Sequence, residues 1–196
     1  MARPQSPDYD KRREALVATA AHLFARQGFQ GASVSDLALQ CGTSKSLIYH
    51  YFPSKDDILY EVMAAHLDAL VDAADDVMRT GGARERLHAL TLAFMRLYVG
   101  AQDSQKVLLN ELDNLPSPRR VEVVAKQRRI IAVVETLVLE IRPDANPLTL
   151  PLTMLFFGMI NWTHTWFRPD GEIDADAMAG IAVDLMLNGL ERLQAS

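Results

Sequence analysis

The chain has few of the residues that cross-link a protein or perform catalysis. Its 196 residues include one cysteine, which excludes an intramolecular disulfide framework and any cysteine-rich zinc or iron–sulfur module. The five histidines, at positions 22, 50, 66, 88 and 164, lack the spacing of metal ligands. There is no GxSxG elbow, phosphate-binding glycine loop or HExxH helix, and Cys41 closes a short helix where burial would make it inert. We therefore expect a protein that is not an enzyme and that binds no metal or cofactor.

A targeting segment is also absent. The first fourteen residues hold seven charged side chains and no apolar core, so we expect the chain in the cytoplasm. Residues 148–167 are twenty residues without Asp, Glu, Lys or Arg, which meets the length of a membrane span. Because Pro151, Asn161, His164 and four threonines interrupt this stretch, we expect a helix covered on most sides by protein, and no membrane partner.

Strand patterns are almost absent from the sequence. Apolar residues recur at three- and four-residue spacing, and glycines and prolines fall between these runs. The sequence predicts an all-α fold of about nine helices, with an N-terminal three-helix helix-turn-helix domain and a C-terminal helical ligand-binding and dimerisation domain. The expected helices span residues 9–27, 33–41, 45–51, 56–78, 83–101, 106–115, 119–141, 147–167 and 175–193.

The charge is distributed unevenly along the chain. The formal net charge of -5 counts against binding to nucleic acid, because phosphates attract a basic surface. However, residues 1–55 hold seven basic and four acidic side chains, a net +3, and the remainder is at -8. This asymmetry is typical of a DNA-binding head on an acidic body.

Two short helices joined by a glycine turn form the centre of this head. Ser33 and Asp36 resemble a capping box that opens the first helix, Gly42 lies in the turn, and Thr43 or Ser44 caps the second helix. In a helix-turn-helix the second helix enters the major groove. Leu47 and Ile48 would anchor that helix, and its small hydroxyls, cation and polar aromatic side chains suit contacts to phosphates and base edges.

The segment GASVSDLALQCGTSKSLIYHYFPSKDDIL, residues 31–59, resembles the signature of the tetracycline-repressor (TetR) family of bacterial transcription regulators. The resemblance extends over about residues 10–70. It departs from the family at Cys41, where alanine is more frequent, and at Ser46, where glycine is frequent. It implies a flexible arm over residues 1–9, a DNA-binding domain over 10–55 with its recognition helix at about 44–51, and an effector-binding and dimerisation domain over 56–196.

Carried over by position, the resemblance implies DNA contacts from Ser33, Thr43, Ser44, Lys45, Ser46, Tyr49, His50, Tyr51 and Lys55. Some of these residues have a second interpretation. Ser33 and Thr43 could serve only as helix caps. Tyr51 and the adjacent Phe52 suit packing that closes the small domain.

The last two predicted helices carry the residues expected to pair two chains. Leu155, Met159, Trp162 and Trp166 repeat at helical spacing, and the last helix is apolar over a wide arc. One face can pack inward and another against a second copy, which would make a four-helix homodimer interface, as the family resemblance also implies. Such a dimer would place two recognition helices about 34 Å apart on a roughly palindromic operator.

The evidence for an effector pocket is a set of apolar residues with a few polar groups. The segment FGMINWTHTWFRPDG, residues 157–171, is similar to the branch of the family whose effectors are acyl-CoA thioesters. That resemblance implies an apolar effector, with Arg96, Arg119, Arg128, Arg129 or Arg168 meeting CoA phosphates. The same aromatic and methionine residues could equally be plain core. The candidate contacts are Phe94, Met95, Tyr98, Leu109, Phe156, Asn161, Trp162, Thr165, Trp166 and Arg168.

The function expected from these observations is a homodimeric repressor released from its operator by a small apolar effector. The alternative is an effector-independent or activating regulator that uses the same DNA-binding head.

Overall fold

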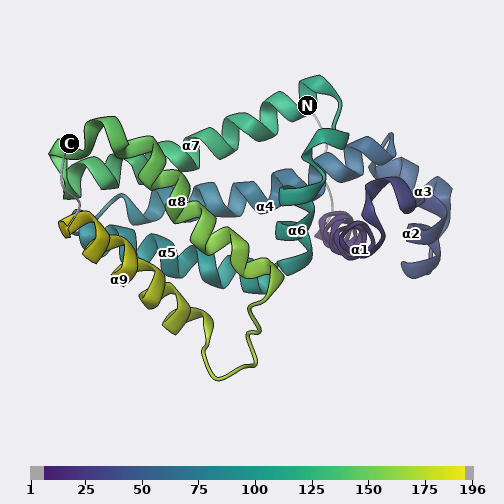
Figure 1. The fold of residues 1–196 in the computed structure, drawn as a ribbon. Helices are drawn as coiled ribbons and strands as arrows, with labels where there is room; N and C mark the ends of the chain where they lie inside the picture. Colours follow the sequence, from purple (N-terminus) through teal and green to yellow (C-terminus); the bar gives the residue numbers. More distant parts are fainter. Residues whose placement is uncertain (1–6, 193–196) are drawn as a thin grey trace. The chain divides into compact units, whose positions relative to one another are not determined.

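The computed structural model describes residues 7–192 and, over this range, is built of α-helices and short 3-10 helices without a strand (Figure 1). The predicted all-α class is therefore confirmed, with nine α-helices in the described part. The chain divides into two compact units: residues 1–66 with Asp103–Val123, and Leu67–Gln102 with residues 124–196. No described helix is long and apolar enough to cross a membrane.

The first unit begins with α1 (Pro7–Gly31), which buries Leu16, Ala20 and Phe24 at helical spacing. Gly28 interrupts this helix with a φ of 73°, a left-handed backbone that favours glycine. Two short helices follow, α2 (Val34–Gln40) and α3 (Lys45–Tyr51). The unit is completed by the start of α4 (Lys55–Val77), by α6 (Gln102–Asn110) with the 3-10 turn η1 (Leu112–Asn114), and by the start of α7 (Ser117–Ile141).

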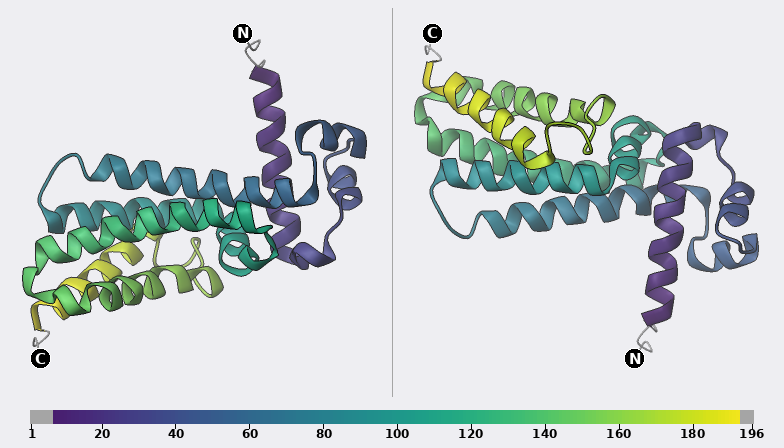
Figure 2. Two further views of the ribbon diagram at one scale, coloured as in Figure 1. Left: turned by 90° about the horizontal axis from the view of Figure 1, so that it is seen from above. Right: turned by 90° about the horizontal axis from the view of Figure 1, so that it is seen from below.

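The second unit contains the remainder of α4 and α7, with α5 (Ala83–Gly100), the 3-10 helix η2 (Pro143–Leu148) and α8 (Thr149–Trp162). After η3 (Thr163–Thr165) an irregular loop leads to α9 (Ala175–Arg192). The last helix packs mainly on α5, and it also lies beside α8 in both views of Figure 2. The core of the unit includes the fully buried side chains of Leu87, Phe94 and Phe156.

The structure refines the predicted boundaries in four places. The predicted helix at 106–115 is α6 followed by η1, and the uncharged stretch is divided among η2, α8 and η3. The predicted boundary after residue 55 marks the end of the helix-turn-helix, whereas the compact units divide inside α4, after His66. Of the predicted flexible arm, residues 7–9 form the first turn of α1, and residues 1–6 lie outside the described residues.

Candidate DNA-binding site

Two local hydrogen-bond motifs hold α2 and the turn after it. The backbone N–H of Asp36 donates to Ser33 Oγ (3.1 Å), and the N–H of Ser33 donates to Asp36 Oδ2 (3.0 Å), so the predicted capping box is formed. At the other end Thr43 N–H donates to the Ala38 carbonyl (2.9 Å) and Gly42 N–H to the Leu39 carbonyl (3.2 Å). This Schellman motif places Gly42 at a φ of 58° and redirects the chain into α3.

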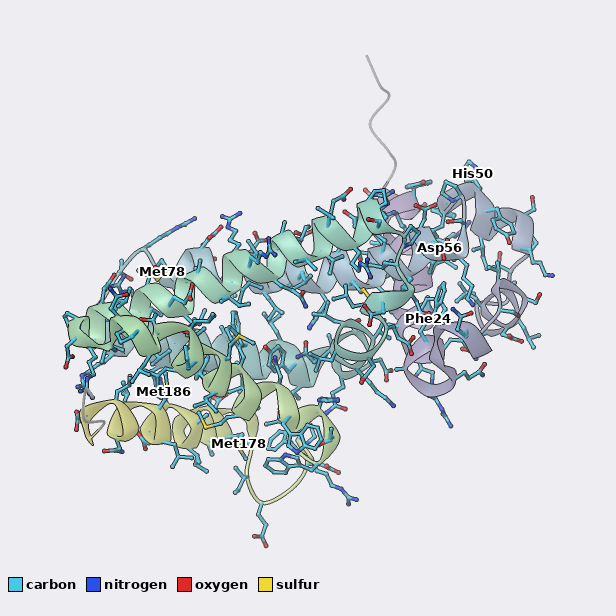
Figure 3. The ribbon with its side chains drawn as sticks, turned by 45° about the horizontal axis from the view of Figure 1, so that its top comes forward. Phe24, His50, Asp56, Met78, Met178 and Met186 are labelled. Atoms are coloured by element: carbon cyan, nitrogen blue, oxygen red, sulfur yellow. The ribbon has the colours of Figure 1, made fainter. Side chains whose placement is uncertain are left out.

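Helix α3 presents four of its seven residues to solvent. Ser44 is its N-cap, because Ser44 Oγ accepts the backbone N–H of Leu47 (3.2 Å), and this leaves the Thr43 hydroxyl uncommitted by capping. Ile48 is fully buried and anchors the helix. The exposed residues are Lys45, Ser46, Tyr49 and His50. Tyr49 is 49% exposed although aromatic, and His50 points outward from the ribbon in Figure 3.

Aromatic and cationic contacts fix the C-terminal end of α3. The Tyr51 ring stacks on Tyr9 of α1 with centroids 4.5 Å apart. Phe52 is buried beneath the Arg13 guanidinium, 5.2 Å from the ring centroid, and Arg13 pairs with Glu61 at 2.6 Å. The Glu61 hydrogen bond raises the pKa of Arg13 above its ordinary value. The sequence predicted the packing of Phe52. It did not predict the stacking of Tyr9 on Tyr51, because the two residues are far apart in the chain.

Five of the residues predicted to contact DNA therefore also have partners inside the head: Ser44 caps α3, the His50 ring lies edge-on to the rings of Tyr9 and Tyr51, and three others have the contacts that follow. Ser33 caps α2, Tyr51 stacks on Tyr9, and Lys55 donates to the Phe29 carbonyl oxygen. The Lys55 ammonium also lies 4.1 Å from the centroid of the Phe29 ring. The other predicted contacts gather on the exposed surface of α3 and at the turn before it.

The predicted effector residues are divided among different surroundings. Phe94, Met95 and Phe156 are fully buried and Tyr98 nearly so, in the core of the second unit. Trp162 and Trp166 are 64% and 55% exposed and line an apolar groove of about 560 Å³ beside α9. The remaining candidates are placed elsewhere: Asn161 is partly exposed, Thr165 and Arg168 are exposed, and Leu109 belongs to α6 of the first unit.

The sequence did not predict one buried polar atom, the hydroxyl oxygen of Thr153. Thr153 is fully buried, and its hydroxyl has no hydrogen-bond partner among the described residues. Other helical threonines satisfy this group locally, as Thr91 does by donating to the Leu87 carbonyl (2.7 Å). Thr153 shares the buried face of α8 with Phe156, Phe157 and Ile160. No pattern in the sequence distinguishes Thr153 from a threonine that bonds to its own helix.

Among the described residues no group of histidine, cysteine, aspartate and glutamate could hold a metal ion. Five arginines were expected to meet CoA phosphates, and three of them form ion pairs with described carboxylates. Arg96 pairs with Asp176 (2.5 Å), Arg119 with Asp57 (3.1 Å) and Arg129 with Asp75 (2.5 Å). The other two, Arg128 and Arg168, are exposed.

A capped, exposed helix held by a preceding helix and a tight turn on a small helical core defines a helix-turn-helix DNA-binding protein. Comparisons with known proteins specify the family. Residues 16–62 match the model of the bacterial regulatory proteins of the tetR family, and residues 80–190 match the tetracyclin repressor-like C-terminal domain. The chain belongs to the TetR family of DNA-binding transcriptional regulators, whose members are not enzymes.

Individual relatives agree over nearly the whole chain. It is 27% identical over 203 residues to the transcriptional repressor KstR2 of Mycolicibacterium smegmatis, covering 97% of each chain. A TetR-family regulator from Bordetella parapertussis is 38% identical with a TM-score of 0.87, over 94% of this chain and 98% of that one. The fold also matches AibR in complex with isovaleryl coenzyme A and operator DNA, at 24% identity and a TM-score of 0.78, over 89% and 97% of the two chains.

Proposed function

We propose that the protein is a homodimeric repressor that binds a roughly palindromic operator and is released by a small apolar effector. The observation that carries this proposal is the exposed surface of α3, in which a cation, hydroxyls and two polar aromatic rings surround one buried anchor. The repressor relative KstR2, which aligns over 97% of the chain, supports the direction of regulation.

In this proposal Thr43, Ser44, Lys45, Ser46, Tyr49 and His50 make the principal DNA contacts. Lys45 and the hydroxyls donate to phosphates, and Tyr49 and His50 reach base edges. Ser33, Tyr51 and Lys55 position this surface through their internal contacts. Because the Lys55 ammonium donates to the carbonyl of Phe29, we expect its contribution to DNA affinity to be smaller than that of the exposed Lys45.

A second copy of the chain would cover the apolar face of α8 and α9. Leu155, Trp162 and Leu185 are each more than 60% exposed in the single chain, although α8 was predicted to be covered on most sides. A large exposed apolar patch indicates an interaction surface. Because a two-fold interface pairs the same surface on both chains, this face can form a four-helix contact. The exposure of Trp162 and Trp166 favours this role for them over effector binding.

The buried face of α8 supports an effector site with one polar contact. An unpartnered buried hydroxyl costs about 1–3 kcal/mol, and an effector carbonyl or hydroxyl could bond to that of Thr153. The apolar residues that share the buried face of α8 with Thr153, such as Phe156 and Ile160, suit an acyl chain. For a CoA thioester, Arg128 and Arg168 are the arginines free to meet phosphates.

Release requires a shift between two arrangements of the dimer. Helices α4 and α7 both contribute residues to the two compact units, and α4 follows the recognition helix directly, so we propose α4 as the element through which an effector would change the spacing of the two heads. A tenfold loss of DNA affinity needs about 1.4 kcal/mol of coupling.

The test is an effector titration against a labelled operator, obtained by selection from random duplexes. Fluorescence anisotropy would follow DNA release by medium- and long-chain acyl-CoA, with free CoA as the matched control. We expect acyl-CoA to lower operator affinity at least tenfold and free CoA to leave it unchanged. If no acyl-CoA or related apolar ligand weakens binding, the ligand-released mechanism fails and the effector-independent alternative stands.

A further inference from the structure

A cleft in the first unit separates the N-terminal half of α1 from the turn of the helix-turn-helix. It has a volume of about 340 Å³. One wall is a single face of α1 that carries Arg12, Leu16 and Thr19. The opposite wall consists of Cys41, Gly42, Thr43 and Leu47, from the turn and from the start of α3. The cleft is therefore adjacent to the proposed DNA-reading surface.

Two polar groups at this cleft are uncommitted. Arg12 is exposed and forms no ion pair with a described residue, whereas the adjacent Arg13 is held by Glu61 at 2.6 Å. Thr43 is half-buried, and because Ser44 caps α3, its hydroxyl donates to no described group. A guanidinium and a hydroxyl thus border one cleft without a protein partner for either.

This pair of groups suits a phosphodiester. A guanidinium presents a planar fork of donors that matches phosphate oxygens, and a threonine hydroxyl adds one more donor. We propose that Arg12 and Thr43 hold a backbone phosphate of the operator, outside the base pairs that α3 reads. The head, with a net charge of only +3 over residues 1–55, would gain a phosphate anchor on α1.

The same helix offers a matched control. Arg26 is also exposed and forms no ion pair in the part of the chain that the structure describes, and it borders a separate cleft of about 310 Å³ with His22 and Gln40. None of the residues lining that cleft is a proposed DNA contact. Fourteen residues along an α-helix place Arg26 about 21 Å from Arg12. Each alanine variant removes one positive charge from the same helix. A difference in DNA affinity between the two variants therefore reflects the position of the arginine and not the change in net charge.

The experiment measures the salt dependence of DNA affinity for Arg12→Ala, Thr43→Val and Arg26→Ala in the full chain. For Arg12→Ala the slope of log K against log salt concentration should become less negative by about 0.9 for each head, about 1.8 for a dimer. At about 0.1 M salt this corresponds to an affinity about eightfold lower per head, with the same loss on operator and non-specific DNA. Thr43→Val should weaken both to a lesser degree, Arg12→Lys should keep the slope, and Arg26→Ala should match the wild type.

The slope does not depend on the fraction of active protein, so a partly unfolded variant would not imitate the result. An unchanged slope for Arg12→Ala, or an equal change for Arg26→Ala, would overturn the proposal. A separate arm tests free phosphate as the ligand. Inorganic phosphate at constant ionic strength should raise the Tm of wild type and Arg12→Ala equally. A rise lost in Arg12→Ala would assign the cleft to a free anion and contradict the role in DNA binding.

Discussion

Replacing Thr153 with valine should make the protein more stable while weakening its response to an effector. Thr153 is fully buried and its hydroxyl has no partner within residues 7–192, so the folded protein bears the cost of removing that group from water. Valine has nearly the same shape and no hydroxyl. We therefore expect Thr153→Val to raise the free energy of unfolding by about 1–2 kcal/mol. For a chain of this length that corresponds to a rise in Tm of about 2–8 °C.

Thr91 provides the matched control for this prediction. It is also fully buried, but its hydroxyl donates to the Leu87 carbonyl at 2.7 Å. Thr91→Val removes a formed hydrogen bond and should lower the free energy of unfolding by about 0.5–1.5 kcal/mol. Thermal unfolding of effector-free protein at one fixed concentration measures both variants, since the proposed dimerisation would make Tm depend on concentration.

The effector titration supplies the second half of this test. Thr153→Val should need more acyl-CoA than the wild type to release the operator, because the ligand loses a hydrogen-bond partner, whereas Thr91→Val should respond normally. The reasoning is refuted if Thr153→Val is no more stable than Thr91→Val. A more stable Thr153→Val with an unchanged effector response would show that the hydroxyl does not meet the ligand.

Three further predictions concern DNA binding, pairing and pH. Tyr49→Ala should abolish footprinting of the operator while the mass in sedimentation stays that of the wild type; a normal footprint would remove Tyr49 from the interface. Leu155→Glu should yield a monomer, whereas Leu39→Glu, at a leucine 82% exposed in the other unit, should keep the native mass; a dimeric Leu155→Glu would refute the proposed pairing face. Stability should decline as pH falls below the ordinary histidine pKa of 6.5, because burial lowers the pKa of His66 and the unfolded chain then binds the proton more readily. His66→Gln should flatten this decline in denaturant midpoints between about pH 7 and about pH 5, and an unchanged slope would exclude His66 as its source.

Local signals in the sequence predicted the helix ends well. The capping box of Ser33 and Asp36 and the glycine turn at Gly42, where φ is 58°, depend on residues a few positions apart. Such motifs are set by backbone geometry within one turn, so residue type and spacing suffice to identify them.

Features that depend on distant residues were not predictable in this way. The Phe29 carbonyl that binds Lys55 lies 26 positions away, and the pairing of Arg13 with Glu61 spans 48. The spacing of apolar residues showed that α8 is apolar on all sides. It did not show which face of α8 is exposed to solvent in the single chain. Trp162 therefore received two roles from the sequence, and its exposure in the structure favours the pairing surface.

Selection of bound sequences from a pool of random duplexes tests the proposed function most directly. Two copies of α3 related by a two-fold axis should enrich an inverted repeat whose half-sites lie about one turn of DNA apart, with two chains bound per duplex. The enrichment should disappear with Tyr49→Ala. Enrichment of a single asymmetric half-site by one chain, or no enrichment by the wild type, would contradict a dimeric operator-binding regulator.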